Sequence, residues 1–388
     1  MKKSLLLRDN EQQATGEKAM RILFINSIQM FGGGEVWMLR TLRALQERGH
    51  HVWLCCRPET ELAKRAIAQG VPVKLLTFRG DFDPFTIARL ARFMKQERIE
   101  VVLTNMDKEL RLGGIAAKIA GVPAVIPRRG IDYPLKNHWR YRLAYNVLAT
   151  RLIANSVATK QALLLNAPWL DPERIEVIYN GIDMQPFLQP SRRCLRTEWG
   201  VPKEAPLLGF VGQLDKRKGI DILLEAFARI YRQIPQVRLV LVGRGPLQEM
   251  IESEVRRQNW GSAVLLPGFI NDVVSVMQAI DILLLPSRWE GFGIVLIEAM
   301  AAGKPAISTN TSSMLEIIAD SQTGYLVPPG DAETLASRAI DLLQNPELRE
   351  QFGRAGRERA AELFTIECMI DKLESLFRRA IDERRKSF

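Results

Sequence analysis

The sequence has 388 residues, a length that suits two domains of about 180 residues each better than a single domain. Hydrophobic residues make up 47% of the chain and charged residues 25%, which provides a sizeable core and argues against general disorder. The net charge of +10 is unevenly divided: residues 1–195 hold 30 Lys and Arg against 18 Asp and Glu, whereas the remainder holds 24 against 26. We therefore expect the N-terminal half to meet an anionic partner.

The first 19 residues precede the first predicted strand. Their apolar stretch Leu5–Leu7 is too short for a signal peptide, and we expect residues 1–19 to form a disordered extension. No apolar run in the sequence reaches the ~20 residues that cross a bilayer. The four cysteines show neither metal nor redox spacing and are expected to be free thiols in a reducing cytoplasm.

In residues 20–185, apolar strands alternate with amphipathic helices, which predicts a doubly wound parallel sheet with helices on both faces. The predicted strands are Arg21–Asn26, His51–Cys55, Val73–Thr77, Val101–Asn105, Ala124–Pro127, Leu152–Asn155 and Ile175–Ile178. The predicted helices are Glu35–Arg48, Thr60–Gln69, Thr86–Gln96 and Lys108–Ala120. A segment rich in Pro and Arg follows, and residues 186–206 are predicted to be a linker.

Residues 207–365 repeat this alternation of strands and helices, which predicts a second doubly wound domain. Its predicted strands are Leu207–Val211, Arg238–Val242, Val264–Pro267, Asp281–Pro286, Ala306–Thr309 and Gly324–Val327. Its predicted helices are Ile220–Gln233, Leu247–Gln258, Val273–Ala279 and Gly293–Ala302, and residues 332–386 are helical throughout. Two such domains that face each other would leave a cleft between their carboxyl edges, closed by a hinge.

One segment of the second half carries the strongest chemical signal. The predicted strand Asp281–Pro286 is followed by Glu290, a turn with glycines, and then Glu298 inside the helix Gly293–Ala302. Backbone N–H groups at the start of such a helix face the carboxyl edge of the sheet, where open α/β sheets bind ligands. N–H donors for phosphate and two acids for hydroxyl groups suit a nucleotide sugar. The alternative is an ordinary strand–loop–helix corner with two surface acids.

The spacing of these two acids, together with their neighbours, resembles the signature of the retaining GT-B glycosyltransferases of family 4. The segments that carry the resemblance are Asn26–Gly34, Val177–Asp183, Phe210–Asp221, Leu241–Leu247, Leu266–Phe269, Pro286–Pro305, Ser308–Asn310 and Asp320–Asp331. The resemblance implies an α/β fold of two Rossmann-like domains that face across a cleft. In this reading, residues 20–185 bind the acceptor, 207–365 bind the nucleotide sugar, and a C-terminal helix, 366–388, crosses back to the first domain.

The resemblance assigns Lys218 to the diphosphate of the donor, because a matching lysine and an arginine five residues earlier hold the diphosphate in the family. Gln213 stands at the position of that arginine here, and Lys216 or Arg217 could supply the missing charge. Positive side chains in a closed site stabilise a diphosphate as it departs.

By the same resemblance, Glu298 binds the ribose hydroxyls, and Glu290 binds a sugar hydroxyl or stabilises charge near the anomeric carbon. The other donor-binding positions are a stretch of backbone for the diphosphate, a cradle for the base and a glycine loop after the first strand. They are Gly291, Phe292, Gly293 and Ile294 for the diphosphate, Gly268 and Phe269 for the base, and Gly33 and Gly34 for the loop.

Many family members carry a histidine just after the strand that corresponds to Ala124–Pro127, and this chain has Arg128 to Asp132 there instead. Arg129 and Asp132 are the candidates to replace that histidine, or its role is unfilled. A protein base is not obligatory if the leaving phosphate takes the proton of the acceptor. No cofactor and no metal are expected, since the nucleotide sugar is a substrate.

The basic and aromatic run Arg128–Tyr145 leaves three interpretations open: a solvated helix face, a groove for phosphorylated sugars, or a patch that meets a membrane surface. With the positive first half, it favours an acceptor that is anionic, lipid-linked or both, such as lipopolysaccharide core. We therefore expect retaining transfer of a hexose or heptose by a cytoplasmic enzyme, peripheral on the inner face of the cytoplasmic membrane.

Three rival functions have less support. The high pI suggests nucleic acid, but no recognition element is present, so no nucleic-acid partner is expected. A nicotinamide-dependent dehydrogenase would need a glycine fingerprint that is broken here. A glycosyltransferase with a small soluble acceptor, or a sugar-nucleotide epimerase of the same architecture, remains the alternative.

Overall fold

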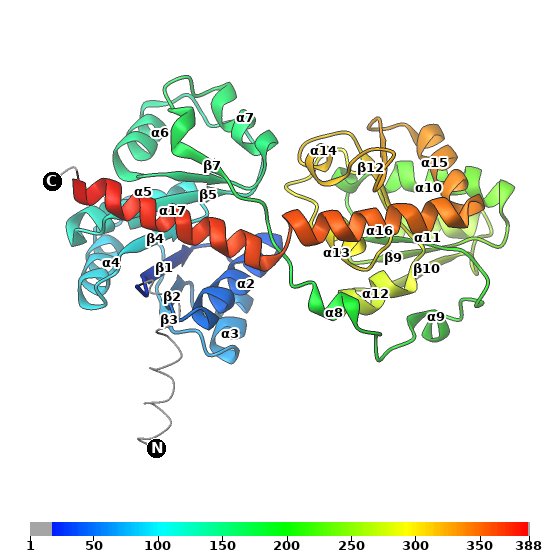
Figure 1. The fold of residues 1–388 in the computed structure, drawn as a ribbon, viewed down its shortest axis with the longest axis horizontal. Coiled ribbons are helices and arrows are strands. Elements are labelled where there is room, and N and C mark those ends of the chain that lie inside the picture. The colour runs from blue at the N-terminus through cyan, green and yellow to red at the C-terminus, as the bar shows by residue number, and fades with distance from the viewer. Residues whose placement is uncertain (1–17, 387–388) are drawn as a thin grey trace, which may run out of the picture. The chain divides into compact units, whose positions relative to one another are not determined.

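The computed structural model of the chain describes residues 18–386. The predicted extension, 1–19, therefore lies outside the described residues except for Lys18 and Ala19. The chain divides into two compact units (Figure 1). The second unit comprises Ser156–Thr159 and Tyr179–Met369. The first unit comprises the chain up to Asn155, Lys160–Ile178 and the C-terminal residues from Ile370. Each unit has its own parallel sheet.

In the first unit, the described residues form a seven-stranded parallel sheet in the order β3-β2-β1-β4-β5-β6-β7. The strands are β1 (Arg21–Asn26), β2 (His51–Cys56), β3 (Val73–Leu75), β4 (Val101–Thr104), β5 (Ala124–Arg129), β6 (Leu152–Ala154) and β7 (Ile175–Val177). The strand order reverses between β1 and β4, and this point at the carboxyl edge is where such sheets bind ligands.

Helices connect these strands, and several begin at polar caps that the sequence supplies. They are α2 (Gly33–Glu47), α3 (Glu61–Ala68), α4 (Pro84–Gln96), α5 (Asp107–Ala120), α6 (Trp139–Leu143), the π-helical turn Ala144–Leu148, and α7 (Val157–Leu165). The Thr60 hydroxyl caps α3 and the Asp83 carboxylate caps α4. Helix α6 and the start of the π-helical turn lie in the run Arg128–Tyr145, for which a solvated helix face is one of the three predicted interpretations.

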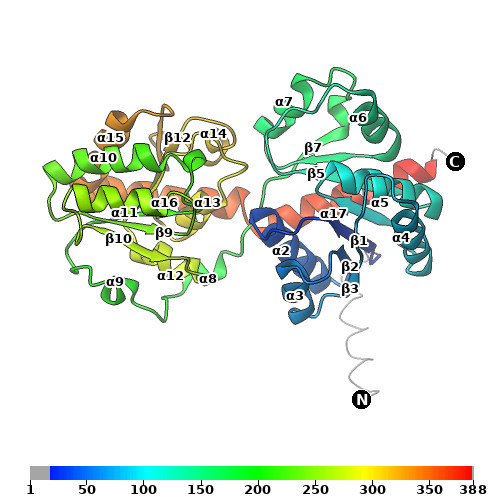
Figure 2. The ribbon, with the colours of Figure 1, turned by 180° about the vertical axis from the view of Figure 1, so that it is seen from behind.

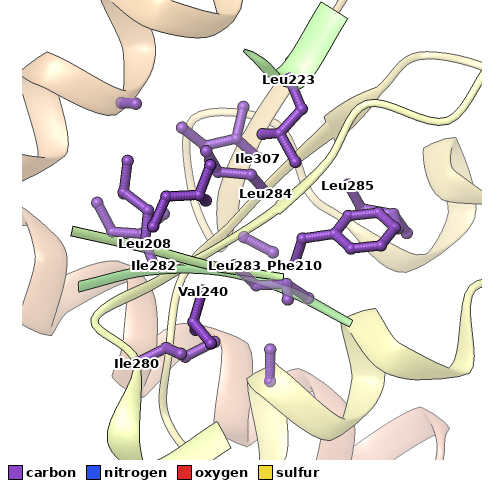
Figure 3. Packing of buried hydrophobic residues seen from close by; sticks show 14 of the residues in the cluster. Leu208, Phe210, Leu223, Val240, Ile280, Ile282, Leu283, Leu284, Leu285 and Ile307 are labelled. Carbon is purple, nitrogen blue, oxygen red and sulfur yellow. The ribbon is translucent and has the colours of Figure 1, made fainter. Parts of the chain in front are cut away.

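In the second unit, the described residues form a six-stranded parallel sheet in the order β10-β9-β8-β11-β12-β13. The strands are β8 (Leu207–Val211), β9 (Arg238–Val242), β10 (Val264–Gly268), β11 (Ile282–Leu285), β12 (Ala306–Thr309) and β13 (Gly324–Val327). Figure 3 shows apolar side chains of the central strands packed with Leu223 of the following helix. The strand order reverses between β8 and β11, so the loops after these strands meet at the carboxyl edge.

The helices of the second unit cover both faces of its sheet, as expected for buried parallel strands. They are α8 (Gln185–Leu188), α9 (Leu195–Glu198), α10 (Ile220–Gln233), α11 (Gln248–Arg257), α12 (Val273–Ala279), α13 (Ile294–Ala301), α14 (Met314–Ile317), α15 (Ala332–Gln344) and α16 (Pro346–Leu363). Among residues 18–386, none of the helices combines the length and apolarity that a bilayer crossing requires.

The segment predicted as a linker, 186–206, is instead an ordered part of the second unit. Phe187 and Leu195 are buried in its core, and Arg196 pairs with Asp281 at a distance of 3.3 Å. Apolar side chains spaced through this segment anchor it, although its Pro and Arg content resembles that of a linker. The chain therefore passes from the first unit to the second at Tyr179, before the predicted linker begins.

The last helix, α17 (Ile366–Lys386), belongs to the first unit from Ile370 onward; it lies in front of that unit in Figure 1 and behind it in Figure 2. Arg48 forms ion pairs with Asp371 and Glu374 of this helix. The imidazole Nε2 of buried His50 lies 2.9 Å from Glu374 Oε1. These contacts attach the C-terminal segment to the first sheet.

Candidate functional site

The turn that carries Lys218 follows β8 and is fixed by local contacts. It is a 3₁₀ turn, Lys216–Lys218, whose Lys218 N–H donates to the Asp215 carboxylate at 3.2 Å. Gly219 then starts α10 with a φ of 66°. A Cβ at Gly219 would lie 2.0 Å from the carbonyl oxygen of Pro286, so only glycine lets this turn approach the end of β11 so closely.

This close approach brings together two of the residues predicted from the sequence. The Lys218 ammonium donates to Glu290 Oε2, and the two side chains are 13% and 14% exposed. The other oxygen of Glu290 accepts the Gly291 N–H at 3.3 Å. Lys218 and Glu290 thus form a largely buried ion pair at the carboxyl edge of the second sheet.

Arg288 fastens the same two loops from their exposed side. Its guanidinium donates to both carboxylate oxygens of Asp221, at 2.7 and 2.6 Å, and to the Lys216 carbonyl at 2.9 Å. Its backbone N–H donates to the Arg217 carbonyl at 2.8 Å. The hydrogen bond from Arg288 lowers the pKa of Asp221. These contacts therefore join the lysine turn to the loop after β11.

Gln213, which stands at the position of the family arginine, contacts Arg217, one of the two candidates for the missing positive charge. Arg217 Nη2 donates to Gln213 Oε1 at 3.1 Å and to the Asp215 carboxylate at 2.7 Å. The Arg217 guanidinium lies 5.7 Å from the centre of the Trp289 ring. Of the two predicted substitutes for the missing arginine, Arg217 holds its charge beside Gln213. Its role in binding a donor remains a prediction.

The second acid of the motif, Glu298, lies on α13 just beyond the loop that begins at Glu290. Gly293 precedes this helix with a φ of 79°, and the Ser313 hydroxyl holds the loop by donating to the Phe292 carbonyl at 3.0 Å. Glu298 is 7% exposed on a helix whose neighbouring side chains are buried and apolar. A carboxylate buried at such a place needs polar partners. The role of Glu298 in binding a donor stays a prediction.

The predicted base cradle lies at the end of β10. Gly268 has a φ of 79°, and its carbonyl accepts the Gly243 N–H at 2.9 Å. A Cβ at Gly243 would lie 1.9 Å from the Gly212 carbonyl oxygen, so the loops after β8, β9 and β10 pack backbone against backbone. Phe269 is 62% exposed beside them. An exposed ring at a ligand-binding edge is consistent with stacking on a base.

In the first unit, the predicted glycine loop leads into α2. Gly33 and Gly34 have open space where a Cβ would be added, so packing does not require glycine at either position. Glu35 is buried and ties this turn to the strand, because it accepts the Asn26 side-chain N–H at 2.9 Å and the Gly32 N–H at 3.0 Å. The predicted approach of this loop to a ligand is not tested by these contacts.

The positions that could replace the family histidine follow β5. Arg129 Nη1 donates to Asp107 at 3.2 Å, and Tyr145 donates its hydroxyl to the same carboxylate oxygen at 2.6 Å. Burial opposes the charge of Arg129, but Tyr145 and Asp107 raise its pKa above the usual value. Arg129 is therefore a permanent cation that cannot accept a proton. Asp132 lies half-buried in the loop that follows.

Comparison with known proteins decides the family. The family model "Glycosyltransferase Family 4" matches residues 31–186, and "Glycosyl transferases group 1" matches 191–359. The chain is 32% identical over 290 residues to N-acetyl-alpha-D-glucosaminyl L-malate synthase of Bacillus anthracis, covering 75% of this chain and 70% of that protein. The chain belongs to the family 4 glycosyltransferases.

Two further similarities agree with this assignment. The glycosyltransferase is 26% identical over 308 residues to the Escherichia coli UDP-Gal:alpha-D-GlcNAc-diphosphoundecaprenol alpha-1,3-galactosyltransferase, covering 76% of this chain and 79% of that enzyme. Its fold matches the crystal structure of Anabaena HepE in complex with UDP, with a TM-score of 0.82 and 23% identity, over 93% of this chain and all of that chain. The predicted GT-B architecture of two α/β domains is confirmed.

The structure also reveals a residue of the glycosyltransferase that sequence reasoning missed. The carboxylate of fully buried Glu109 accepts the N–H groups of Ser27 at 2.5 Å, Asn105 at 2.8 Å and Met106 at 3.0 Å. Burial raises its pKa to about 7, against the effect of these hydrogen bonds. Glu109 ties the loops after β1 and β4 together, and a glutamate in the first turn of a helix was the available signal.

Proposed function

We propose that the glycosyltransferase moves a hexose or heptose from a nucleoside diphosphate sugar to an anionic acceptor, with retention of configuration. The observation that carries the proposal is the buried Lys218–Glu290 pair beside the loop that leads to α13 and Glu298. A cation, helix N–H groups and carboxylates are the groups that bind a diphosphate and sugar hydroxyls. The complex of HepE with UDP supports this class of donor.

In the proposed reaction, the acceptor oxygen bonds to the anomeric carbon on the face from which the diphosphate leaves. The bond between that carbon and the β-phosphate oxygen breaks, and its electron pair stays on the phosphate. The acceptor proton passes to the same phosphate oxygen, so no side chain is needed as the base. Lys218 stabilises the charge that develops on the phosphate, and Arg217 adds a second cation nearby.

Two acceptor classes are supported by the named relatives, and both are anionic. The E. coli enzyme is named for a diphosphoundecaprenol acceptor, which favours a lipid-linked acceptor and a place at the membrane surface. The B. anthracis enzyme is named for malate, which favours a small soluble acid. The charge of the first 195 residues, +12, suits either one. We propose the lipid-linked class, with lipopolysaccharide core as one example, and a peripheral place on the inner face of the cytoplasmic membrane.

The proposal is tested by incubating the purified protein with a panel of nucleotide sugars, first by thermal shift and then with candidate acceptors. We expect one donor class to raise the melting temperature, and proton coupling in the product to show the anomeric configuration of the donor. EDTA is expected to leave the rate unchanged, because in this proposal cationic side chains, and not a metal ion, stabilise the charge of the diphosphate. An inverted product would refute retention, and the absence of any nucleotide binding would refute the proposed function.

Replacing Glu290 with glutamine is expected to tighten UDP binding by about fivefold while lowering kcat. Glu290 pairs with the Lys218 ammonium that the diphosphate needs, and its carboxylate adds negative charge near the incoming phosphates. Calorimetric titration with UDP measures the first effect. Glu249→Gln, an exposed change on α11, is the matched control. Weaker UDP binding by the Glu290→Gln variant would contradict this role of the ion pair.

A further inference from the structure

The first unit contains a basic hollow at the edge of its sheet, and none of its lining residues is assigned to the reaction. It has a volume of about 280 Å³ and lies between the edge strand β3 and helix α4. Its lining combines three cations with apolar side chains: Lys74, Leu75, Leu76, Arg89, Arg92, Phe93 and Gln96. None of these lining residues is acidic, so every charged side chain that lines the hollow is positive.

Helix α4 explains why the cations gather there. Phe85, Arg89, Arg92 and Gln96 follow one another at intervals of four, three and four residues, which aligns them along a single exposed stripe. The opposite face, with Leu90 and Met94, is buried in the core. The helix Pro84–Gln96 contains three basic residues and no acidic one. The charged residues of its solvent face are therefore all basic, and an exposed aromatic ring lies in its first turn.

The neighbouring helices show how different this face is. Exposed cations of α2 and α3 pair with acids one turn away, as in Arg43–Glu47 and Arg65–Glu61. Within residues 18–386, no carboxylate forms an ion pair with Lys74, Arg89 or Arg92, and Lys74 instead lies 5.6 Å from the centre of the Phe93 ring. Like charges that share a hollow repel each other, and an anion bound among them would relieve that repulsion.

The apolar side chains around the hollow point to the kind of anion. Phe85 is 72% exposed, and Phe82 and Leu75 are also exposed. A soluble phosphate makes no apolar contact with exposed rings. A membrane surface, in contrast, has headgroup phosphates for the cations and, just below them, acyl chains for the rings. Long basic side chains at the headgroups and aromatic rings at the interface are the usual combination in proteins that lie on membranes.

We propose that the hollow between β3 and α4 is the membrane-docking site of the glycosyltransferase. Lys74, Arg89 and Arg92 bind the phosphates of anionic phospholipids there, and Phe82 and Phe85 enter the interface. This inference rests on the proposed membrane-linked acceptor and gives the attachment a location. It differs from the run Arg128–Tyr145, which also exposes basic and aromatic side chains, including Trp139 on α6.

The test is flotation of the full-length protein with vesicles of equimolar phosphatidylglycerol and phosphatidylcholine. Each cation near an anionic surface strengthens binding by about fivefold, so the triple variant Lys74→Ala, Arg89→Ala, Arg92→Ala is expected to bind about 100-fold more weakly. Phe85→Ser, which leaves every charge in place, is expected to lose about tenfold or more. Raising the salt from about 0.1 to about 0.5 M should weaken binding of the unmodified protein.

The matched control is the triple variant Lys136→Ala, Arg140→Ala, Arg142→Ala, which removes the same number of exposed cations from the region of α6. We expect it to float like the unmodified protein, and all variants to keep their melting temperature and their UDP affinity. Loss of flotation in the control alone would overturn the location. If the unmodified protein does not float, membrane docking is refuted altogether, while UDP binding separately reports on donor use.

Discussion

Replacement of Lys218 by methionine is expected to lower kcat by about 100- to 1,000-fold with little effect on folding. The ammonium pairs with Glu290 at the start of the loop that leads to α13, and it is 13% exposed, so solvent screens it poorly. In the proposed reaction, negative charge accumulates on the departing diphosphate, and a fixed cation lowers the energy of that state more than the energy of the bound donor. Single-turnover kinetics with saturating donor measures the effect.

The control for this prediction is Lys216→Met, two residues earlier on the same turn. Lys216 is exposed and its backbone carbonyl, which remains in the variant, accepts the Arg288 guanidinium. We expect this change to alter kcat by less than about threefold, since an exposed charge is largely screened. Equal losses in both variants would mean that the net charge of the turn matters and the position of Lys218 does not. A normal rate for Lys218→Met would remove Lys218 from the reaction.

Much of the fold could be predicted because buried parallel strands are apolar along their whole length. The four residues Ile282–Leu285, for example, are all fully buried, and their run of apolar letters stands out in the sequence. Composition was misleading at residues 186–206, where Pro and Arg suggest a linker but Phe187 and Leu195 are core residues. Apolar side chains scattered through a polar segment give no clear periodic signal, so their burial becomes visible only in three dimensions.

The sequence named candidate site residues, but it did not show which of them are in contact. Lys218 and Glu290 are separated by 72 positions, and their pairing depends on β8 and β11 being neighbours in the sheet. The sequence suggested two substitutes for the missing arginine, and only geometry shows that Arg217 reaches Gln213. The Arg288–Asp221 clamp also escaped prediction, because two exposed charges on separate loops look like ordinary surface residues.

Glu298→Gln is expected to weaken donor binding by about 10- to 100-fold, the cost of losing one hydrogen bond to a charged acceptor. A carboxylate accepts two hydroxyl hydrogen bonds, whereas the amide must turn one NH₂ group toward a donor hydroxyl. Glu298 lies on the rigid, buried helix α13, so the amide cannot move away to find another arrangement. The dissociation constant of the donor, measured by calorimetry, is the quantity to compare.

A purely structural role for Glu298 would give a different result, because burial makes its carboxylate a candidate for internal hydrogen bonding as well. In that case the glutamine variant would melt at a lower temperature and lose donor and acceptor binding together. A ligand role predicts an unchanged melting temperature without ligand and a smaller stabilisation by added donor, since that stabilisation follows donor affinity. Unaltered donor affinity would refute the assignment. The Glu290→Gln variant, in contrast, is expected to bind UDP more tightly. The two variants therefore shift nucleotide affinity in opposite directions, although each removes one carboxylate from the same loop–helix segment.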